Sequence, residues 1–142
     1  MGTVSKSVEI PAPRQEVWDT VTDPGRFADW QTIHVGFAGD PPEQLSEGAE
    51  FKQKVTIMGM PGEIAWTVMT FENPSRLTLD GAGPMGTKAT ATFSLEDADE
   101  GTKFTYESGF EGAALAPLAG ALEQQSAKAA DESLEKLKAL VS

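Results

Sequence analysis

The chain has 142 residues, of which 22 are acidic and 11 are Lys or Arg, so its formal net charge is −11, and it contains no cysteine. This negative charge would repel a nucleic-acid backbone, and the lack of cysteine excludes disulfides, thiol nucleophiles and thiolate metal sites. We therefore expect one domain over residues 1–142 that binds no nucleic acid. No apolar run approaches the roughly 18 residues that span a bilayer, which predicts a cytoplasmic protein without membrane contact.

The first 30 residues predict one strand and two short helices. Residues 4–10 alternate between apolar and polar side chains, and Lys6 interrupts the apolar face, which is typical of an edge strand. Pro13 suits the first turn of a helix, because proline has no N–H to donate. Asp23 is a good N-cap for a second short helix that ends at Trp30.

Residues 33–110 predict six further strands joined as hairpins. Apolar and polar residues alternate in the segments 33–39, 50–58, 63–71, 76–81, 87–95 and 102–110, and Gly, Pro, Asn and acidic residues separate them. We expect "GMPG" at 59–62 to supply a turn, because Pro61 fixes one dihedral and Gly62 tolerates the left-handed conformation that a type II turn requires. We expect the acidic segment 96–101 to be a solvated hairpin tip and not a calcium or magnesium site, because it lacks the spacing of a calcium loop.

The last two strands have the clearest alternation. It predicts that Glu107 and Glu111 are solvated and that the opposite face points inward. The inward residues are Ala89, Ala91, Phe93 and Leu95 on one strand, and Phe104, Tyr106, Ser108 and Phe110 on its partner.

Residues 113–141 predict a long helix, because they are rich in Ala, Leu, Glu and Lys and include Pro117 near the start. Its C-terminal turns carry leucines, whereas its middle has small side chains. We therefore expect tight packing against the sheet at 134–141 and an open space under 118–129.

This order of elements resembles the helix-grip fold of the START-like, Bet v 1-like superfamily, also called SRPBCC, which includes the polyketide cyclases and dehydrases. The resemblance lies in "VEIPAPRQEVWDTVTDPGRFADW", in "PSRL" and in the C-terminal helix. "WQTIH", "GMPGEIAWTV" and "LTLDGAG" further resemble an actinobacterial subgroup described as toxins of type II toxin–antitoxin pairs. The resemblance implies an α+β fold in which a curved seven-stranded antiparallel sheet wraps around the C-terminal helix, with a cavity for an apolar or amphipathic ligand between them.

A broad aromatic sheet under a helix of small residues leaves space for a guest, and methionines could adapt to guests of different shape. Gln53, Tyr106 and Ser108 are polar residues at inward positions, which should bond a ligand, a water or each other. The candidate ligand-contacting residues are Trp30, His34, Phe37, Phe51, Gln53, Met58, Met60, Trp66, Met69, Phe71, Phe93, Tyr106, Ser108, Leu118 and Leu122.

His34 is the single histidine of the chain and has two interpretations. It could act as a general acid or base, with Tyr106 as its partner in a cyclase-like enzyme. It could instead line the pocket or make a structural hydrogen bond. The sequence favours the second, because no linked Ser/His/Asp or Cys/His motif supplies an orienting group.

Three functions follow from these observations. We favour a non-catalytic carrier or sensor of a small apolar or amphipathic molecule. The alternatives are a polyketide cyclase- or dehydrase-like enzyme, and a toxin component that acts through a protein partner such as an antitoxin. We expect no metal and no cofactor, because one histidine cannot form a multi-histidine metal site and the glycines of 81–86 lack the residues of a phosphate loop.

Overall fold

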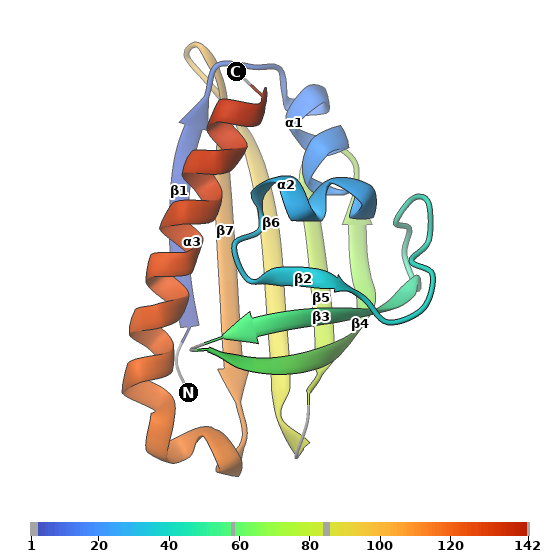
Figure 1. Cartoon of the computed structure of the whole chain (residues 1–142). Helices are drawn as coiled ribbons and strands as arrows, with labels where there is room; N and C mark the ends of the chain where they lie inside the picture. Colours follow the sequence, from blue (N-terminus) through green and yellow to red (C-terminus); the bar gives the residue numbers. More distant parts are fainter. Residues whose placement is uncertain (1–2, 58, 84–85, 142) are drawn as a thin grey trace.

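The computed structural model describes residues 3–57, 59–83 and 86–141. Its centre is one seven-stranded antiparallel sheet with the strand order β1-β7-β6-β5-β4-β3-β2 (Figure 1). The strands are β1 (Thr3–Ile10), β2 (His34–Phe37), β3 (Glu50–Ile57), β4 (Met60–Glu72), β5 (Arg76–Ala82), β6 (Lys88–Ala98) and β7 (Gly101–Glu111). The α+β helix-grip architecture expected from the sequence is confirmed, and β1 is an edge strand as Lys6 indicated.

The sheet curls around α3 (Ala119–Val141), so that β2 and β3 cross in front of β5 and β6 in Figure 1. The α3 helix packs mainly along β1 and also contacts β3. The helices α1 (Arg14–Val21) and α2 (Phe27–Trp30), joined by the 3-10 turn η1 (Pro24–Arg26), close the end of the sheet near the C-terminus of α3. Both short helices expected after the first strand are therefore present.

The caps of these helices follow the sequence signals. Pro13 is the N-cap residue of α1, directly before its first turn. The Asp23 carboxylate accepts a hydrogen bond from the Gly25 N–H at 2.9 Å, which satisfies a donor at the start of η1. Arg14 ties α1 to the sheet, because it donates to the Ser75 hydroxyl and forms an ion pair with Asp97 at 3.0 Å.

Two turn predictions were wrong in position. Ile57 pairs with Met60, so the two strands come together before Pro61, and Gly59 has a φ of 75°. Pro61 and Gly62 belong to β4, where they pair with Thr56 and Val55 of β3. The acidic hairpin is also tighter than expected, since Ala98 pairs with Gly101 and the strands extend into 96–98.

The C-terminal helix begins later than expected. Residues Ala113–Leu118 form a separate 3-10 turn, η3, and the α-helix starts at Ala119. Pro117 lies inside that turn and has no N–H for an i to i−4 hydrogen bond, which explains why the α-helix begins only after it. The 23 residues of α3 correspond to about 35 Å of helix, enough to cross the sheet.

The core lies where α1, α2 and the C-terminal turns of α3 meet the sheet. Trp18, Trp30, Phe27, Phe93 and Phe104 are its largest fully buried side chains. Their rings meet mostly edge to face, a favoured geometry for aromatic pairs. The predicted tight packing at the end of α3 is confirmed, because Leu134 and Leu137 are buried.

Candidate functional site

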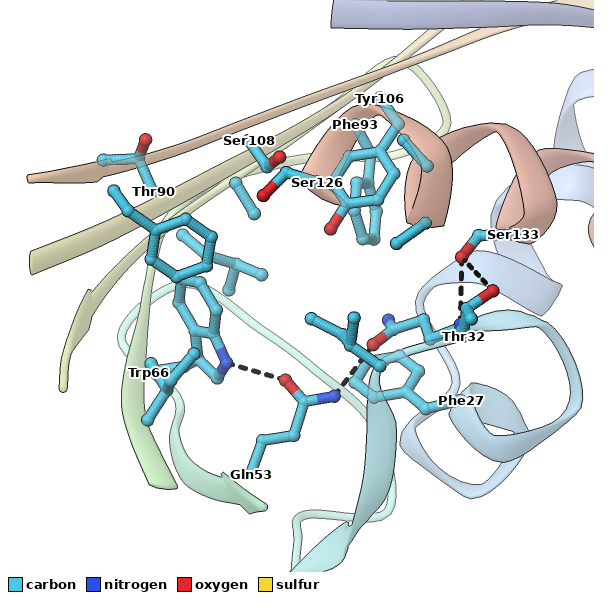
Figure 2. A pocket seen from close by; sticks show the side chains of 18 of the residues that line it. Phe27, Thr32, Gln53, Trp66, Thr90, Phe93, Tyr106, Ser108, Ser126 and Ser133 are labelled. Atoms are coloured by element: carbon cyan, nitrogen blue, oxygen red, sulfur yellow. Dashed lines mark hydrogen bonds between the residues drawn. The ribbon is translucent and has the colours of Figure 1, made fainter. Parts of the chain in front are cut away.

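A cavity of about 270 Å³ lies between the concave face of the sheet and α3. Its floor comes from strands β3 to β7, one end is formed by Phe27 and residues 31–33, and its roof is residues 125–133 of α3 (Figure 2). The open space under the small-residue part of α3 is therefore present, but it lies several residues nearer the C-terminus than the predicted 118–129.

Most of the cavity wall is apolar. The wall residues from the strands point inward because successive side chains alternate between the two faces of the sheet. Gly81 has no side chain and leaves room for the Trp66 ring over β5. The apolar wall residues are Phe27, Ile33, Phe51, Ile64, Trp66, Leu79, Ala91, Phe93, Phe110, Ala129 and Ala130.

Gln53 is the polar centre of the floor and is only 3% exposed. Its side-chain oxygen accepts a hydrogen bond from the Trp66 indole N–H at 2.9 Å. Its amide nitrogen lies 2.8 Å from the side-chain oxygen of Gln31 and 2.8 Å from Nδ1 of His34. Because an indole N–H can only donate, the amide orientation is fixed and its two N–H groups point to Gln31 and His34. Both N–H groups of the Gln53 amide therefore serve protein partners, and its oxygen accepts one hydrogen bond from Trp66.

This network sets the protonation of His34. Its Nδ1 accepts from Gln53, so the ring is neutral with its proton on Nε2. Burial lowers the pKa of His34 from 6.5, because the charged form is less well solvated there. The ring packs against Phe27 and Phe37, at centroid distances of 5.9 and 4.9 Å. His34 is thus held as a neutral hydrogen-bond acceptor, and it is not among the residues that line the cavity.

The opposite side of the cavity carries hydroxyl groups. The hydroxyl cluster consists of Tyr106 and Ser108 from β7 and Ser126 from α3 (Figure 2). Among the cavity residues drawn in Figure 2, none forms a hydrogen bond with these three side chains. Burial raises the pKa of Tyr106 to about 12, so its phenol stays protonated and can donate at neutral pH.

Ser133 fixes the roof at one end. The Thr32 N–H donates to the Ser133 oxygen at 2.9 Å, and the Ser133 hydroxyl donates to the Thr32 oxygen at 3.1 Å. These bonds join α3 to the segment that follows α2. The rim of the roof carries Lys128 and Glu132, which are exposed and one helical turn apart.

Six of the predicted ligand-contacting residues meet in the cavity wall: Phe51, Gln53, Trp66, Phe93, Tyr106 and Ser108. Whether they contact a ligand stays a prediction. Leu118 lies in η3 before α3 begins, is 37% exposed and is not among the residues that line the cavity, so its contact with a ligand also stays a prediction. Leu122 is half-buried and does not line the cavity. Met58 and the side chain of Met60 lie outside the described residues.

Met69 and Phe71 do not line the cavity either, and a β-bulge accounts for the position of Phe71. Val68 pairs with Leu79 but Thr70 pairs with Thr78, so β4 has one extra residue at Met69. The period of two from Ile64, Trp66 and Val68 already places Met69 on the outer face, where it is 51% exposed. The extra residue moves the next inward position from Thr70 to Phe71. Phe71 then packs on Trp18 at 5.2 Å, in the core beside the cavity.

Trp30 and Phe37 lie behind the wall. Trp30 is fully buried against Phe93 and Tyr106, and its indole N–H has no hydrogen-bond partner within the described part of the chain. Phe37 packs on Phe27 and on the Phe51 ring at 6.0 Å. Both residues support the cavity without facing it.

Sequence reasoning missed the residues that close the cavity. Gln31 and Thr32 lie between α2 and the alternating segment 33–39, so no periodic signal marked them. Ile33 begins that segment but was not among the candidate ligand-contacting residues. The roof residues Gln125 and Ser126 were not predicted, because the apolar stripe of the helix identifies its leucines and not its polar residues. A search for polar residues on the helix face that also carries Ala129 and Ser133 could have found them.

The family model for polyketide cyclase / dehydrase and lipid transport matches residues 1–142. The chain belongs to this family. Among curated proteins, it is 30% identical over 115 residues to "Toxin Rv0910" of Mycobacterium tuberculosis (strain ATCC 25618 / H37Rv), covering 81% of this chain and 80% of that protein. It is 29% identical over 102 residues to "Uncharacterized protein Rv1546" of the same strain, covering 72% of this chain and 71% of that protein. The resemblance to toxin-named proteins is thus confirmed as sequence similarity.

Solved structures show the same fold. The hypothetical protein jhp0584 from Helicobacter pylori matches with a TM-score of 0.78 at 15% identity, over 99% of this chain and 88% of that one. Ara h 8.0201 matches with a TM-score of 0.70 at 14% identity, over 99% and 97%. DynU16, described as belonging to the dynemicin biosynthetic locus, matches with a TM-score of 0.71 at 23% identity, over 96% of this chain and 46% of that one. At these identities the matches establish the fold alone.

Within the described residues, no helix is both long enough and apolar enough to cross a membrane.

Proposed function

We propose that this protein binds a small apolar or amphipathic molecule in the cavity under α3 and acts as a non-catalytic carrier or sensor. The observation that carries the proposal is a cavity of about 270 Å³ with an apolar wall and hydroxyl groups on one side. Small-molecule sites combine these two features, since apolar walls supply affinity and a few polar groups fix orientation.

The state of the polar residues favours binding over proton transfer. A general acid or base works best when its pKa is near the working pH. Burial raises the pKa of Tyr106 to about 12, and Nδ1 of His34 is occupied by the Gln53 amide. Tyr106 lines the cavity but His34 does not, so the proposed acid–base pair does not face a common substrate position.

A guest retained during purification tests this function. We expect native mass spectrometry of the protein purified from its own host to show an additional small mass that is released on denaturation. Ala129→Leu, which adds a larger side chain to the roof, should abolish the retained mass. Ala139→Leu is the matched control, because Ala139 is exposed on the same helix. The proposal fails if wild type carries no guest, or if both variants carry it as wild type does.

The toxin name of the mycobacterial relative supports a second candidate function, in which the protein acts on a cellular partner and is held by an antitoxin-like protein. Induced expression in a mycobacterial host should then slow growth, and co-expression of the protein encoded next to this gene should relieve the effect and form a complex with the chain. Normal growth on induction, with no complex formed, would remove this candidate.

A further inference from the structure

The size and the polarity of the cavity limit what it can hold. An apolar cavity of about 150 Å³ accommodates the six carbons of benzene. At the same volume per atom, about 270 Å³ corresponds to roughly eleven non-hydrogen atoms. This is the size of two fused aromatic rings with one substituent, and it is the part of an occupant that the cavity can enclose.

Charge further restricts the occupant. Within the described wall, the charged residues are Lys128 and Glu132, which lie exposed at the rim and have opposite signs. A buried carboxylate or ammonium group would therefore lack a buried counter-ion, and burying such a group without one is costly. The interior of the cavity favours uncharged molecules.

Gln53 has no free N–H, because its two N–H groups point to Gln31 and His34, while its oxygen accepts from Trp66. Among the other polar wall residues, Thr56, Thr90 and Gln125 are exposed, and Gln31 and Thr32 already bond to Gln53 and Ser133. The polar end of the occupant is therefore best placed at the hydroxyl cluster. The hydroxyl cluster of Tyr106, Ser108 and Ser126 lies on the other side and forms no hydrogen bond to the residues drawn in Figure 2. The protonated Tyr106 phenol can donate, and the two serines can donate or accept.

We propose, on the basis of the function above, that the occupant is a compact uncharged molecule of about eleven non-hydrogen atoms, with one oxygen that bonds to the hydroxyl cluster. Its apolar body lies among Phe51, Trp66, Phe93 and Phe110. Its oxygen accepts a hydrogen bond from Tyr106.

A set of four probes tests size, charge and polarity separately by equilibrium dialysis at neutral pH. Naphthol has the expected size and a neutral hydroxyl, naphthalene lacks the oxygen, naphthoate carries a charge, and hydroxypyrene keeps the hydroxyl on a larger body. We expect naphthol to bind most tightly and naphthalene about tenfold more weakly, as loss of one hydrogen bond implies. Naphthoate and hydroxypyrene should bind at least tenfold more weakly than naphthol.

The Tyr106→Phe variant identifies the donor. It should weaken naphthol binding several-fold and leave naphthalene binding unchanged, because it removes only the hydroxyl. Thr105→Ala, on the outer face of the same strand, is the control and should change neither. Equal binding of naphthol and naphthoate, equal binding of naphthol and hydroxypyrene, or equal effects of Tyr106→Phe on naphthol and naphthalene would each overturn the proposal.

Failure of this inference can be told apart from failure of the proposed function. If purified protein retains a host-derived guest but prefers the charged or the larger probe, the carrier function stands and the inferred class is wrong. If it retains no guest and none of the four probes binds, the carrier function itself is wrong.

Discussion

At the level of single residues, Gln53 makes most of the side-chain hydrogen bonds in the floor of the cavity. It links β3 to β4 through Trp66, to the segment after α2 through Gln31, and to β2 through His34. Burying an amide lowers the stability of the folded state unless its polar groups form hydrogen bonds. Removing Gln53 or one of these partners would therefore leave a buried polar group without its hydrogen bond.

Replacing Gln53 by Met keeps the size of the side chain and removes its hydrogen bonds. The buried Trp66 N–H then loses its acceptor, so we expect the free energy of unfolding to fall by about 1–3 kcal/mol. Urea denaturation followed by circular dichroism measures this change. Lys52→Met, at the exposed neighbouring position, should stay within about 0.5 kcal/mol of wild type. A Gln53→Met protein as stable as wild type would show that the network contributes nothing net.

His34 gives a pH dependence whose sign is determined. It is the single histidine of the chain, so its ring signals in NMR spectra belong to one group. The unfolded chain takes up this proton near pH 6.5 and the folded protein only at lower pH. The unfolded state binds more protons between these two values, so stability falls as the pH drops from above 6.5 through the lowered pKa.

An NMR titration of His34 should therefore have its midpoint below 6.5. Gln53→Met should move this midpoint upward, because it removes the N–H that occupies Nδ1. His34→Gln should lose the part of the pH dependence that the ring contributes. A midpoint at or above 6.5 in the wild-type protein would contradict the neutral state inferred here.

The alternation of the strands was sufficient to predict that Gln53, Tyr106 and Ser108 point inward. It could not predict their partners, because Gln53 meets Gln31 and His34 only after β2 folds beside β3. The sequence therefore could not show that the Gln53 amide is already bonded while the hydroxyls of Tyr106 and Ser108 are available. The structure was needed for this distinction.

At the level of elements, the bulge in β4 and the glycine in β5 decide how the floor is shaped. Trp66 pairs with Gly81 across β4 and β5. A Cβ atom at position 81 would lie 2.6 Å from Cγ2 of Ile64 and 2.7 Å from Cε3 of Trp66. Both contacts are far closer than packed carbon atoms tolerate. Glycine at this position thus lets two wall residues lie close to β5.

Gly81→Ala should displace Ile64 and Trp66 and weaken the bond from Trp66 to Gln53. We expect a loss of about 1–3 kcal/mol in the free energy of unfolding and a shifted Trp66 indole signal in the NMR spectrum. Gly36→Ala is the matched control, since a Cβ there would meet nothing within 4 Å. Equal stability of both variants would show that the sheet accommodates the extra carbon without moving Trp66.

The order of strands and helices was predictable because hairpins with clear alternation leave few alternatives. Features that depend on the backbone conformation of a single residue, such as a bulge or a turn, were not predictable. The inward position of Phe71 depends on a bulge, which adds a residue to β4 without changing the composition of the strand. The turn before β4 was misplaced because Gly59 and Gly62 both allow a positive φ, and only pairing shows which one adopts it.

At the level of the whole molecule, α3 has two parts with different roles. Its C-terminal part carries Leu134 and Leu137, which are buried in the core. Its middle carries Ser126 and Ala129, which cover the cavity. The sequence indicated this division by the size of the side chains, and the structure places the boundary near Ser133, where the helix is tied to Thr32.

This division predicts that stability and binding can be changed separately. Leu137 has no exposed surface, so Leu137→Ala should lower the free energy of unfolding by about 2–5 kcal/mol. Leu122 is half-buried at the other end of α3, and Leu122→Ala should cost clearly less. Denaturation curves of the two variants give both values. Similar losses would mean that both parts of the helix hold the sheet equally.

Ligand binding should depend on the middle of α3 and not on its C-terminal part, which is the opposite of what we expect for stability. Naphthol at a concentration of 100 times its dissociation constant raises the free energy of unfolding by about 2.7 kcal/mol, provided that it binds only the folded state. Because Leu137 does not line the cavity, Leu137→Ala should keep this increment while starting from a lower stability. Ala129→Leu should lose the increment while unfolding near the wild-type midpoint. If the increment disappears together with the stability in Leu137→Ala, the core and the cavity form one cooperative unit and α3 has no separable parts.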